Sequence, residues 1–405
     1  MRPLALALAL AAFSSCSPGP KGEGPRPPGP AASAPRPAGG SAAPAKPVLR
    51  TFLRGCNDYR LSALEGGSFV HVGVIEPLLN VPGARTPAAL HVLPDGSIDR
   101  PSSTRAERLF GRFPERAWAQ PPPAQWRQGR WEAIKAPEGV TPVAWLPWAG
   151  GRVVLVGKRA GGGTAVLLED TGAPPEGFVA PAELSRLEPR SAISLPEAPA
   201  LVIHGTLNDD PSYVAVAGSV RALLKNDAGD SIYALPPHPR DRLLFAHRPP
   251  AGKPRVVRIA HDRLTPAEPF PVAPVALAAD DAGVEWLLSN DGELFRHEPP
   301  GAAWAPVAQV SALGLRRLPT LAPGQGGLWL SFRGGVFFAR DDGEIESIPL
   351  PPEIDAGLAS VDVLGVDHEG RVWAGAWVGA RATSYLLTSG PVPAALSCDE
   401  ALRGL

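Results

Sequence analysis

Short apolar runs alternate with glycine, proline, asparagine and aspartate along most of the sequence after residue 48, a pattern typical of many short β-strands. The clearest stretch contains four such runs in succession: Pro274–Ala279, Val284–Ser289, Glu293–His297 and Trp304–Gln309. The dipeptide Asp291-Gly292 between the second and third runs favours a tight β-hairpin turn. The pattern therefore predicts a four-stranded antiparallel sheet in which the strands follow one another from the inside outwards.

This unit recurs along the C-terminal third of the chain. Trp286, Trp329 and Trp373 lie 43 and 44 residues apart, and each is followed by a glycine-containing turn and a further apolar run. A fixed period of this length, made of short strands and turns, indicates a β-propeller with about four strands in each blade. We therefore expect an all-β domain over residues 48–405, with about seven four-stranded blades and with six or eight as alternatives.

Further strand-like runs occupy the region before residue 270. They are Ser68–Val74, Ala89–Leu93, Gly129–Ile134, Arg152–Gly157, Thr164–Leu168, Leu201–Gly205, Tyr213–Ala217, Ser231–Leu235, Arg242–Ala246 and Arg255–Ile259. Three short segments favour helix instead. Thr104–Glu107 and Ser397–Glu400 fit a capping box, and Pro181–Leu187 has room for one or two turns.

The three tryptophan segments resemble the two-component-regulator propeller repeat, Asp-x-x-Gly-x-Leu-Trp-x-Gly-Thr-x-x-Gly-Gly-Leu. Asp280 and Asp367 match its first position, whereas Pro323 stands there in the middle segment, and only Gly375 is kept from the Gly-Thr pair. The resemblance covers about residues 275–390. It implies the propeller fold and nothing about activity.

The first fifteen residues have the pattern of a bacterial secretory signal: Arg2 is followed by the apolar run Leu4–Ala12 and by small side chains. Phe13–Cys16 resembles the lipobox of bacterial lipoproteins, which implies that Cys16 carries a diacylglycerol group and further acyl chains such as palmitate. Ser17 follows the cysteine where an aspartate would retain the protein in the inner membrane, so the resemblance favours the outer membrane. The alternative is an ordinary signal peptide with a chance cysteine.

Residues 16–47 have the composition of a disordered tether. Ser17–Pro47 contains ten prolines, six glycines and seven alanines, and it has no aromatic or branched aliphatic residue. Such a segment cannot bury enough apolar surface to offset the entropy lost on ordering. Its length corresponds to roughly 30 Å as a flexible coil and about 95 Å as a polyproline-like chain. We expect it to hold a lipid-anchored domain away from the bilayer.

Two further cysteines, Cys56 and Cys398, lie near the two ends of the predicted propeller. An exported protein meets an oxidising environment, in which such a pair forms a disulfide. A Cys56–Cys398 bond would bring the ends of the domain together. The alternative is a pair of buried free thiols.

The sequence contains no local motif of a catalytic, cofactor or metal site. It lacks a Gly-x-Ser-x-Gly elbow, a His-Glu-x-x-His pair, a Walker A motif and a dinucleotide fingerprint. The glycine-rich stretch Gly157–Thr164 lies between two strand-like runs and favours a hairpin over a phosphate loop. Asn226–Asp230 and Asp367–Glu369 do not have EF-hand spacing, so solvated turns are expected there rather than calcium sites. We predict no catalytic residue, cofactor or metal ligand.

Charge and architecture together limit the partners. Residues 48–405 carry a net charge of −5, which disfavours nucleic acid as a partner. We expect a monomeric envelope module that binds a protein, peptide or glycan; the alternative is a hydrolase or lyase with a site assembled at the propeller channel. The residues expected to share the binding face are Asn290, Arg316, Arg317, Arg333 and Arg381, because turns between second and third strands lie beside the links between blades.

Overall fold

The computed structural model describes residues 48–405 apart from short gaps, of which the longest are 74–87, 235–241 and 311–319. The predicted signal peptide, Cys16 and the predicted tether lie outside the described residues. Those residues belong to one compact unit, Lys46–Leu405. They are mostly β-strand, and the α-helix among them is α1 (Cys398–Leu402). Over the same residues, no helix has the length and apolar character needed to cross a bilayer.

The described strands form eight sheets, numbered here as blades 1 to 8 in chain order. Blade 1 contains β2 (Asp58–Leu64), β3 (Gly67–Gly73), β4 (Ala88–Val92) and β5 (Ile98–Arg105); blade 2 contains β6 (Arg108–Arg112), β7 (Arg116–Gln120), β8 (Ala124–Arg127) and β9 (Arg130–Ala133). Blade 3 contains β10 (Val140–Trp148), β11 (Arg152–Arg159) and β12 (Thr164–Leu168); blade 4 contains β13 (Glu188–Leu195), β14 (Ala200–Leu207), β15 (Asp210–Ala217) and β16 (Val220–Lys225).

The second half of the chain continues the same arrangement. Blade 5 contains β17 (Ser231–Ala234), β18 (Arg242–Arg248), β19 (Arg255–Ala260) and β20 (Arg263–Pro266); blade 6 contains β21 (Pro274–Ala279), β22 (Glu285–Ser289), β23 (Glu293–His297) and β24 (Ala305–Gln309). Blade 7 contains β25 (Thr320–Gly324), β26 (Gly327–Phe332), β27 (Gly335–Arg340) and β28 (Ile345–Ile348). Blade 8 contains β29 (Ala359–Val366), β30 (Val372–Val378), β31 (Thr383–Thr388), β1 (Arg50–Arg54) and β32 (Leu396–Ser397).

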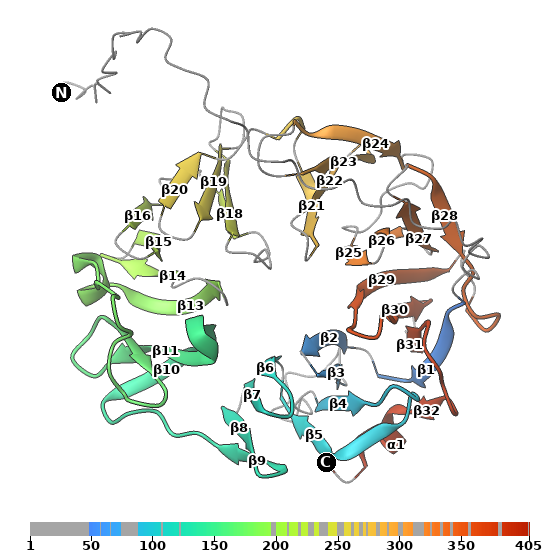
Figure 1. The fold of residues 1–405 in the computed structure, drawn as a ribbon, viewed down its shortest axis with the longest axis horizontal. Helices are drawn as coiled ribbons and strands as arrows, with labels where there is room; N and C mark the ends of the chain where they lie inside the picture. The colour runs from blue at the N-terminus through green and yellow to red at the C-terminus, as the bar shows by residue number, and fades with distance from the viewer. Residues whose placement is uncertain are drawn as a thin grey trace, which may run out of the picture. The chain divides into compact units, whose positions relative to one another are not determined.

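The sheets succeed one another around a central axis, which is the arrangement of a β-propeller (Figure 1). The all-β propeller prediction is thus confirmed, and the blade number is eight, the upper alternative, rather than seven. The strand order expected in blade 6 is also confirmed, because β21 to β24 pair in sequence. Residues 48–405 accommodate eight blades because blade 3 has only three described strands and blade 8 takes its fourth strand, β1, from the N-terminal end of the domain.

The three repeated tryptophans occupy equivalent places. Trp286, Trp329 and Trp373 lie on β22, β26 and β30, the second strand of each blade, and all three are buried. Each belongs to an apolar cluster that extends beyond its own sheet, such as the one that joins Trp286 of blade 6 to Leu330 of blade 7. The spacing read from the sequence is therefore the spacing of blades, and the tryptophans form part of the packing between them.

Alternating strand direction gives the ring two distinct faces. The turns between first and second strands and between third and fourth strands lie on one side, called here the turn face. The turns between second and third strands and the links between blades lie on the other side, called here the link face. Because every blade begins at the link face with its inner strand, this division is the same around the ring.

The ring is closed by β1, which pairs antiparallel with β31 and becomes the fourth strand of blade 8. Arg50, at the start of β1, pairs with Thr388 and donates a hydrogen bond to the carbonyl oxygen of Gly390, so this end of the strand lies at the turn face. Gly55, just after β1, donates to the carbonyl oxygen of Ser384 at the other end. The chain that precedes residue 48 therefore joins the ring at the turn face.

A non-repetitive segment takes the place of the fourth strand in blade 3. After β12 the chain returns to the link face through residues 169–187, which include a short 3-10 helix, Ala182–Ser185. Leu184 and Leu187 from this segment are buried in one cluster with Val166 and Leu168 of β12. The short helix confirms the turn expected at 181–187, and apolar packing replaces the missing strand.

The two capping-box predictions have different outcomes. Ser397 caps α1 as expected, with its side chain accepting from the amide of Glu400. The helix expected at Thr104–Glu107 is wrong, because Thr104 belongs to β5 and pairs with Ala89 of β4. Pairing between strands outweighs a local helix signal of four residues.

Candidate functional site

The five residues predicted for the binding face lie outside the described residues: Asn290, Arg316, Arg317, Arg333 and Arg381. The structure therefore neither brings them together nor separates them. The best-defined polar constellation in the described part of the chain lies elsewhere, where blade 8 meets blade 1. It is called here the closure cluster and consists of Ser68, Leu93, Asp367, Glu369, Arg371 and Trp373.

The closure cluster is organised by the turn between β29 and β30. Asp367 accepts hydrogen bonds from the amide of Arg371 at 2.9 Å and from the indole nitrogen of Trp373 at 2.8 Å. Asp280 accepts in the same way from the amide of Val284 in blade 6. The aspartate at the first position of the repeat therefore fixes a tight turn, and in blade 8 it also orients the blade tryptophan.

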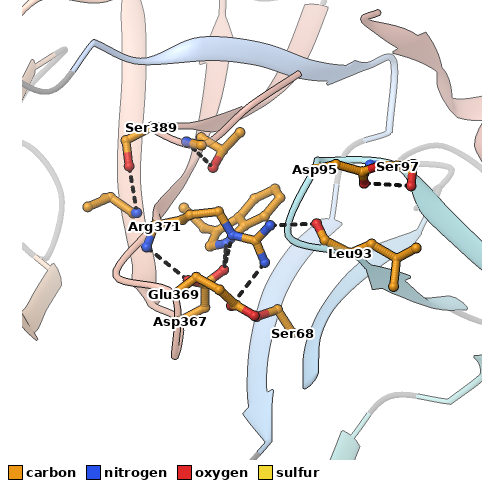
Figure 2. A network of polar contacts seen from close by, with 12 residues as sticks. Ser68, Leu93, Asp95, Ser97, Asp367, Glu369, Arg371 and Ser389 are labelled. Carbon is orange, nitrogen blue, oxygen red and sulfur yellow. Dashed lines mark hydrogen bonds and ion pairs between the residues drawn. The ribbon is translucent and has the colours of Figure 1, made fainter. Parts of the chain in front are cut away.

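The side chain of Arg371 links this turn to blade 1 (Figure 2). Its Nε donates to Asp367 Oδ2 at 2.7 Å, and its Nη2 donates to Glu369 Oε2 at 3.1 Å. Its Nη1 donates to the carbonyl oxygen of Leu93, at the end of β4, at 2.7 Å. Glu369 completes the bridge by accepting from the hydroxyl of Ser68 on β3 at 2.9 Å.

The closure cluster is a structural clamp rather than a reaction centre. Arg371 is 5 % exposed and Asp367 is 6 % exposed, so a substrate does not reach either group. A buried charge is tolerated only when it is paired and hydrogen-bonded, and here two carboxylates and a carbonyl surround one guanidinium. The expectation of a solvated turn at Asp367–Glu369 is wrong for Asp367, which is buried and accepts hydrogen bonds from Arg371 and Trp373.

A disulfide forms a second connection at the same junction. Cys56 and Cys398 are bonded to each other across 342 positions, with 5.2 Å between their Cα atoms. The predicted pairing is therefore confirmed. The bond joins the segment that follows β1 to α1, and it lies in an apolar cluster with Phe52, Trp373 and Leu386.

The C-terminal helix is held from the side of blade 1. Arg100 on β5 donates hydrogen bonds to the carbonyl oxygens of Glu400 at 2.8 Å and of Arg403 at 2.6 Å. These carbonyls lie at the C-terminal end of α1, where a cation is favoured by the unsatisfied carbonyl groups. Arg105 donates to the carbonyl oxygen of Leu405. The last residues of the chain therefore span blades 8 and 1.

The buried histidine of blade 1 resembles a nucleophile–base pair in its geometry. The hydroxyl of Ser62 lies 2.8 Å from His71 Nε2, and His71 Nδ1 lies 3.0 Å from the carbonyl oxygen of Ala106. Burial lowers the pKa of His71 to about 4, with the charge of Arg60 acting in the same direction. An imidazole in this setting does not gain a proton near neutral pH, because burial disfavours the imidazolium form more than the Ala106 carbonyl and the charge of Asp58 favour it. The arrangement is that of a core histidine.

Two other buried histidines also have fixed partners. His91 Nδ1 lies 3.3 Å from Asp99 Oδ2 and the ring stacks on Phe69, and burial lowers the pKa of His91. His297 Nδ1 lies 2.8 Å from Glu285 Oε2, and both side chains are almost fully buried. A catalytic pair needs access to substrate, which the His297–Glu285 pair does not have. Within the described ranges, no group of three or more His, Cys, Asp or Glu side chains is placed to bind a metal ion.

No family model matches the sequence of this chain, and no curated protein matches it either. Solved structures match through their fold. The propeller of Dos1 has 10% sequence identity and a TM-score of 0.48, with 86% of this chain and 97% of the other chain covered.

Two further solved structures have the same kind of similarity. The WD40 domain of Neurospora crassa Pan2 has 9% identity and a TM-score of 0.41, with 85% of this chain and 96% of the other covered. The extracellular domain of a hybrid two-component system from B. thetaiotaomicron has 11% identity and a TM-score of 0.39, with 84% and 39% covered. At this level the similarity carries no information on function, and the propeller assignment rests on the sheets of this chain itself.

Proposed function

We propose that this protein is a lipid-anchored module of the bacterial cell envelope whose propeller binds a protein or peptide partner through its link face. In this proposal Cys16 is acylated and inserted in the membrane, more specifically the outer membrane. The residues from 17 to 47 form the tether, and the propeller catalyses nothing.

The place where the tether joins the ring carries this proposal. Arg50 lies at the turn face, next to Gly390, and β1 then runs between β31 and β32 of blade 8 to the link face. A chain anchored through the turn face leaves the link face free to meet a partner. Propellers bind partners through loop-lined faces of this kind, where the scaffold holds the loops in fixed positions.

The Cys56–Cys398 bond supports export of the chain. Structural disulfides persist in oxidising compartments such as the bacterial periplasm and are rare in the cytosol. The lipobox-like segment Phe13–Cys16 supports the same route. Two acyl chains on one cysteine are sufficient for stable attachment to a bilayer.

Metabolic labelling tests the anchor. Cells that express the full-length chain are grown with labelled palmitate, and the parent is compared with Cys16→Ser after fractionation. We expect label in the parent only, and we expect the variant to leave the membrane fraction. A parent without label, or a variant that stays with the membrane, contradicts the anchoring part of the proposal.

Chemical cross-linking in intact cells, followed by purification and mass spectrometry, tests the binding part. We expect a reproducible envelope protein linked to lysines or termini near the link face. The same preparation is screened for hydrolase and lyase activity against envelope polymers and peptides. Turnover that survives further purification would favour the enzyme alternative and contradict a pure binding role.

A further inference from the structure

A group of arginines lies on the link face where blade 3 meets blade 4. Arg159 ends β11, Arg186 follows the short 3-10 helix, and Arg190 lies near the start of β13. The three are called here the link-face arginines. Their segments lie side by side, because Thr164 donates a hydrogen bond to the carbonyl oxygen of Leu187 at 2.9 Å.

These arginines keep their charge available to solvent. All three are exposed, and within the part of the chain that the structure describes none of them forms an ion pair with a carboxylate. The side chain of Arg159 donates to the carbonyl oxygen of Thr164 at 3.3 Å. Two carboxylates lie on these segments: Glu183 is in the short 3-10 helix, and Glu188 is paired with Lys158 at 2.9 Å, a hydrogen bond that holds the pKa of Glu188 below its usual range.

The local charge is opposite to that of the domain. Residues 48–405 are acidic overall, yet this part of the link face carries Lys158 and the three arginines against only two carboxylates on the same segments, Glu183 and Glu188. The exposed guanidinium group is the side chain that pairs best with carboxylates, because its planar fork can donate two parallel hydrogen bonds. Burial lowers the pKa of nearby His204, and the positive charge of Arg190 acts in the same direction.

The hairpin beside Arg159 leaves room for a main chain. Ala160, Gly161 and Gly162 are exposed, and the space next to the two glycines contains no atom within 4 Å of where a Cβ would lie. Gly163, in contrast, packs against the main chain of Ser185, which fixes the base of the hairpin. An extended peptide laid beside this ridge would place alternate side chains about 7 Å apart on one side.

The geometry points to an acidic peptide segment as the ligand of the link-face arginines: a stretch rich in Asp or Glu within a protein partner. This inference rests on the proposed binding function and names the chemistry of its partner. The glycine ridge admits the peptide main chain, and the arginines receive successive carboxylates.

Fluorescence anisotropy tests this inference with the full-length protein in mild detergent. The probe is a fluorescein-labelled decamer of glutamate, and a decamer of glutamine with the same label is the control peptide. The test variant is Arg159→Gln/Arg186→Gln/Arg190→Gln. The matched variant is Arg112→Gln/Arg127→Gln/Arg130→Gln, which removes the same charge from exposed arginines of the turn face.

We expect saturable binding of the glutamate decamer, about tenfold weaker binding in the link-face variant, and a change below about twofold in the turn-face variant. The single variant Arg190→Gln should weaken binding roughly twofold, which keeps the test valid if the triple variant folds poorly. Equal losses in both triple variants, or no saturable binding of the probe, would overturn the inference.

Two comparisons separate this inference from the proposed function. If an oligomer of uronic acid binds more tightly than the glutamate decamer through the same arginines, the peptide assignment is wrong. If the partner found by cross-linking in cells is retained unchanged by the link-face variant, the inference fails while the binding function stands. If no partner is found although the decamer binds, the proposed function fails instead.

Discussion

The guanidinium of Arg371 donates a hydrogen bond of 2.7 Å to the main-chain carbonyl oxygen of Leu93, which lies 278 positions earlier in the chain. Arg371 belongs to the last blade and Leu93 to the first, so the bond exists only when the ring is closed. β1 and the disulfide act at the outer side of the same junction. Closure therefore has three components that substitutions can separate.

Replacing Arg371 by leucine should strongly destabilise the propeller. The substitution leaves Asp367 buried without its cation, and removal of one partner from a buried pair typically costs about 3–5 kcal/mol. Urea unfolding followed by tryptophan fluorescence measures the loss. Arg54→Leu is the control, because Arg54 and Glu353 form an exposed pair and should contribute at most about 1 kcal/mol. Similar losses in both variants would show that the closure cluster does not clamp the ring.

Loss of the disulfide should weaken the domain without preventing closure. Cys56→Ser/Cys398→Ser should lower the free energy of unfolding by roughly 2–4 kcal/mol, because the unfolded chain is no longer cross-linked. The pairing of β1 with β31 remains, so the native fluorescence spectrum should be preserved. Alkylation of the native, unreduced protein provides the direct check by mass spectrometry. Two modified thiols at Cys56 and Cys398 would contradict the bond.

Acid should destabilise the domain through His71. Its pKa is about 4 in the folded protein against 6.5 for an unperturbed histidine, so the unfolded chain binds more protons between these values. The contribution of His71 to the free energy of unfolding is then fully present above about pH 6.5. It is lost as the pH drops towards 4, by about 3 kcal/mol in all. Ser62, Ala106, Arg60 and Asp58 surround the ring or act on its charge.

Unfolding measured from pH 4 to 7 in the parent and in His71→Gln isolates this contribution. The variant should be less stable at pH 7 but should lose less stability on acidification. A His71 imidazole signal that titrates near pH 6.5 in the folded protein would contradict the assignment.

Local pattern was sufficient to predict the interior of a blade. The runs of blade 6 and the tryptophan spacing depend on contacts between neighbouring strands, which are encoded by alternation and by turns such as Asp291-Gly292. Asp280 and Asp367 were also recognisable, because an aspartate that binds an amide four positions later acts within one turn. The pairing of Cys56 with Cys398 followed from composition and compartment.

Contacts between distant segments were not predictable in the same way. Nothing near Arg50–Arg54 indicates that this strand completes the last blade, and nothing near Arg371 indicates Leu93 as its acceptor. Thr104 is the opposite case: its local sequence fits a helix cap, but in the structure this residue pairs with Ala89 in a sheet. The link-face arginines were missed because they come from three separate segments, of which only the glycine-rich hairpin stood out in the sequence.

Site-specific photo-cross-linking in living cells tests most directly whether the link face is the one that meets a partner. A photoreactive phenylalanine is placed at Ala160 on the link face and, in a separate strain, at Gln128 on the turn face; both residues are exposed. We expect a discrete adduct from position 160 that is reduced when Arg159, Arg186 and Arg190 are replaced by glutamine, and we expect none from position 128. An adduct from position 128 alone, or equal adducts from both positions, would contradict the account.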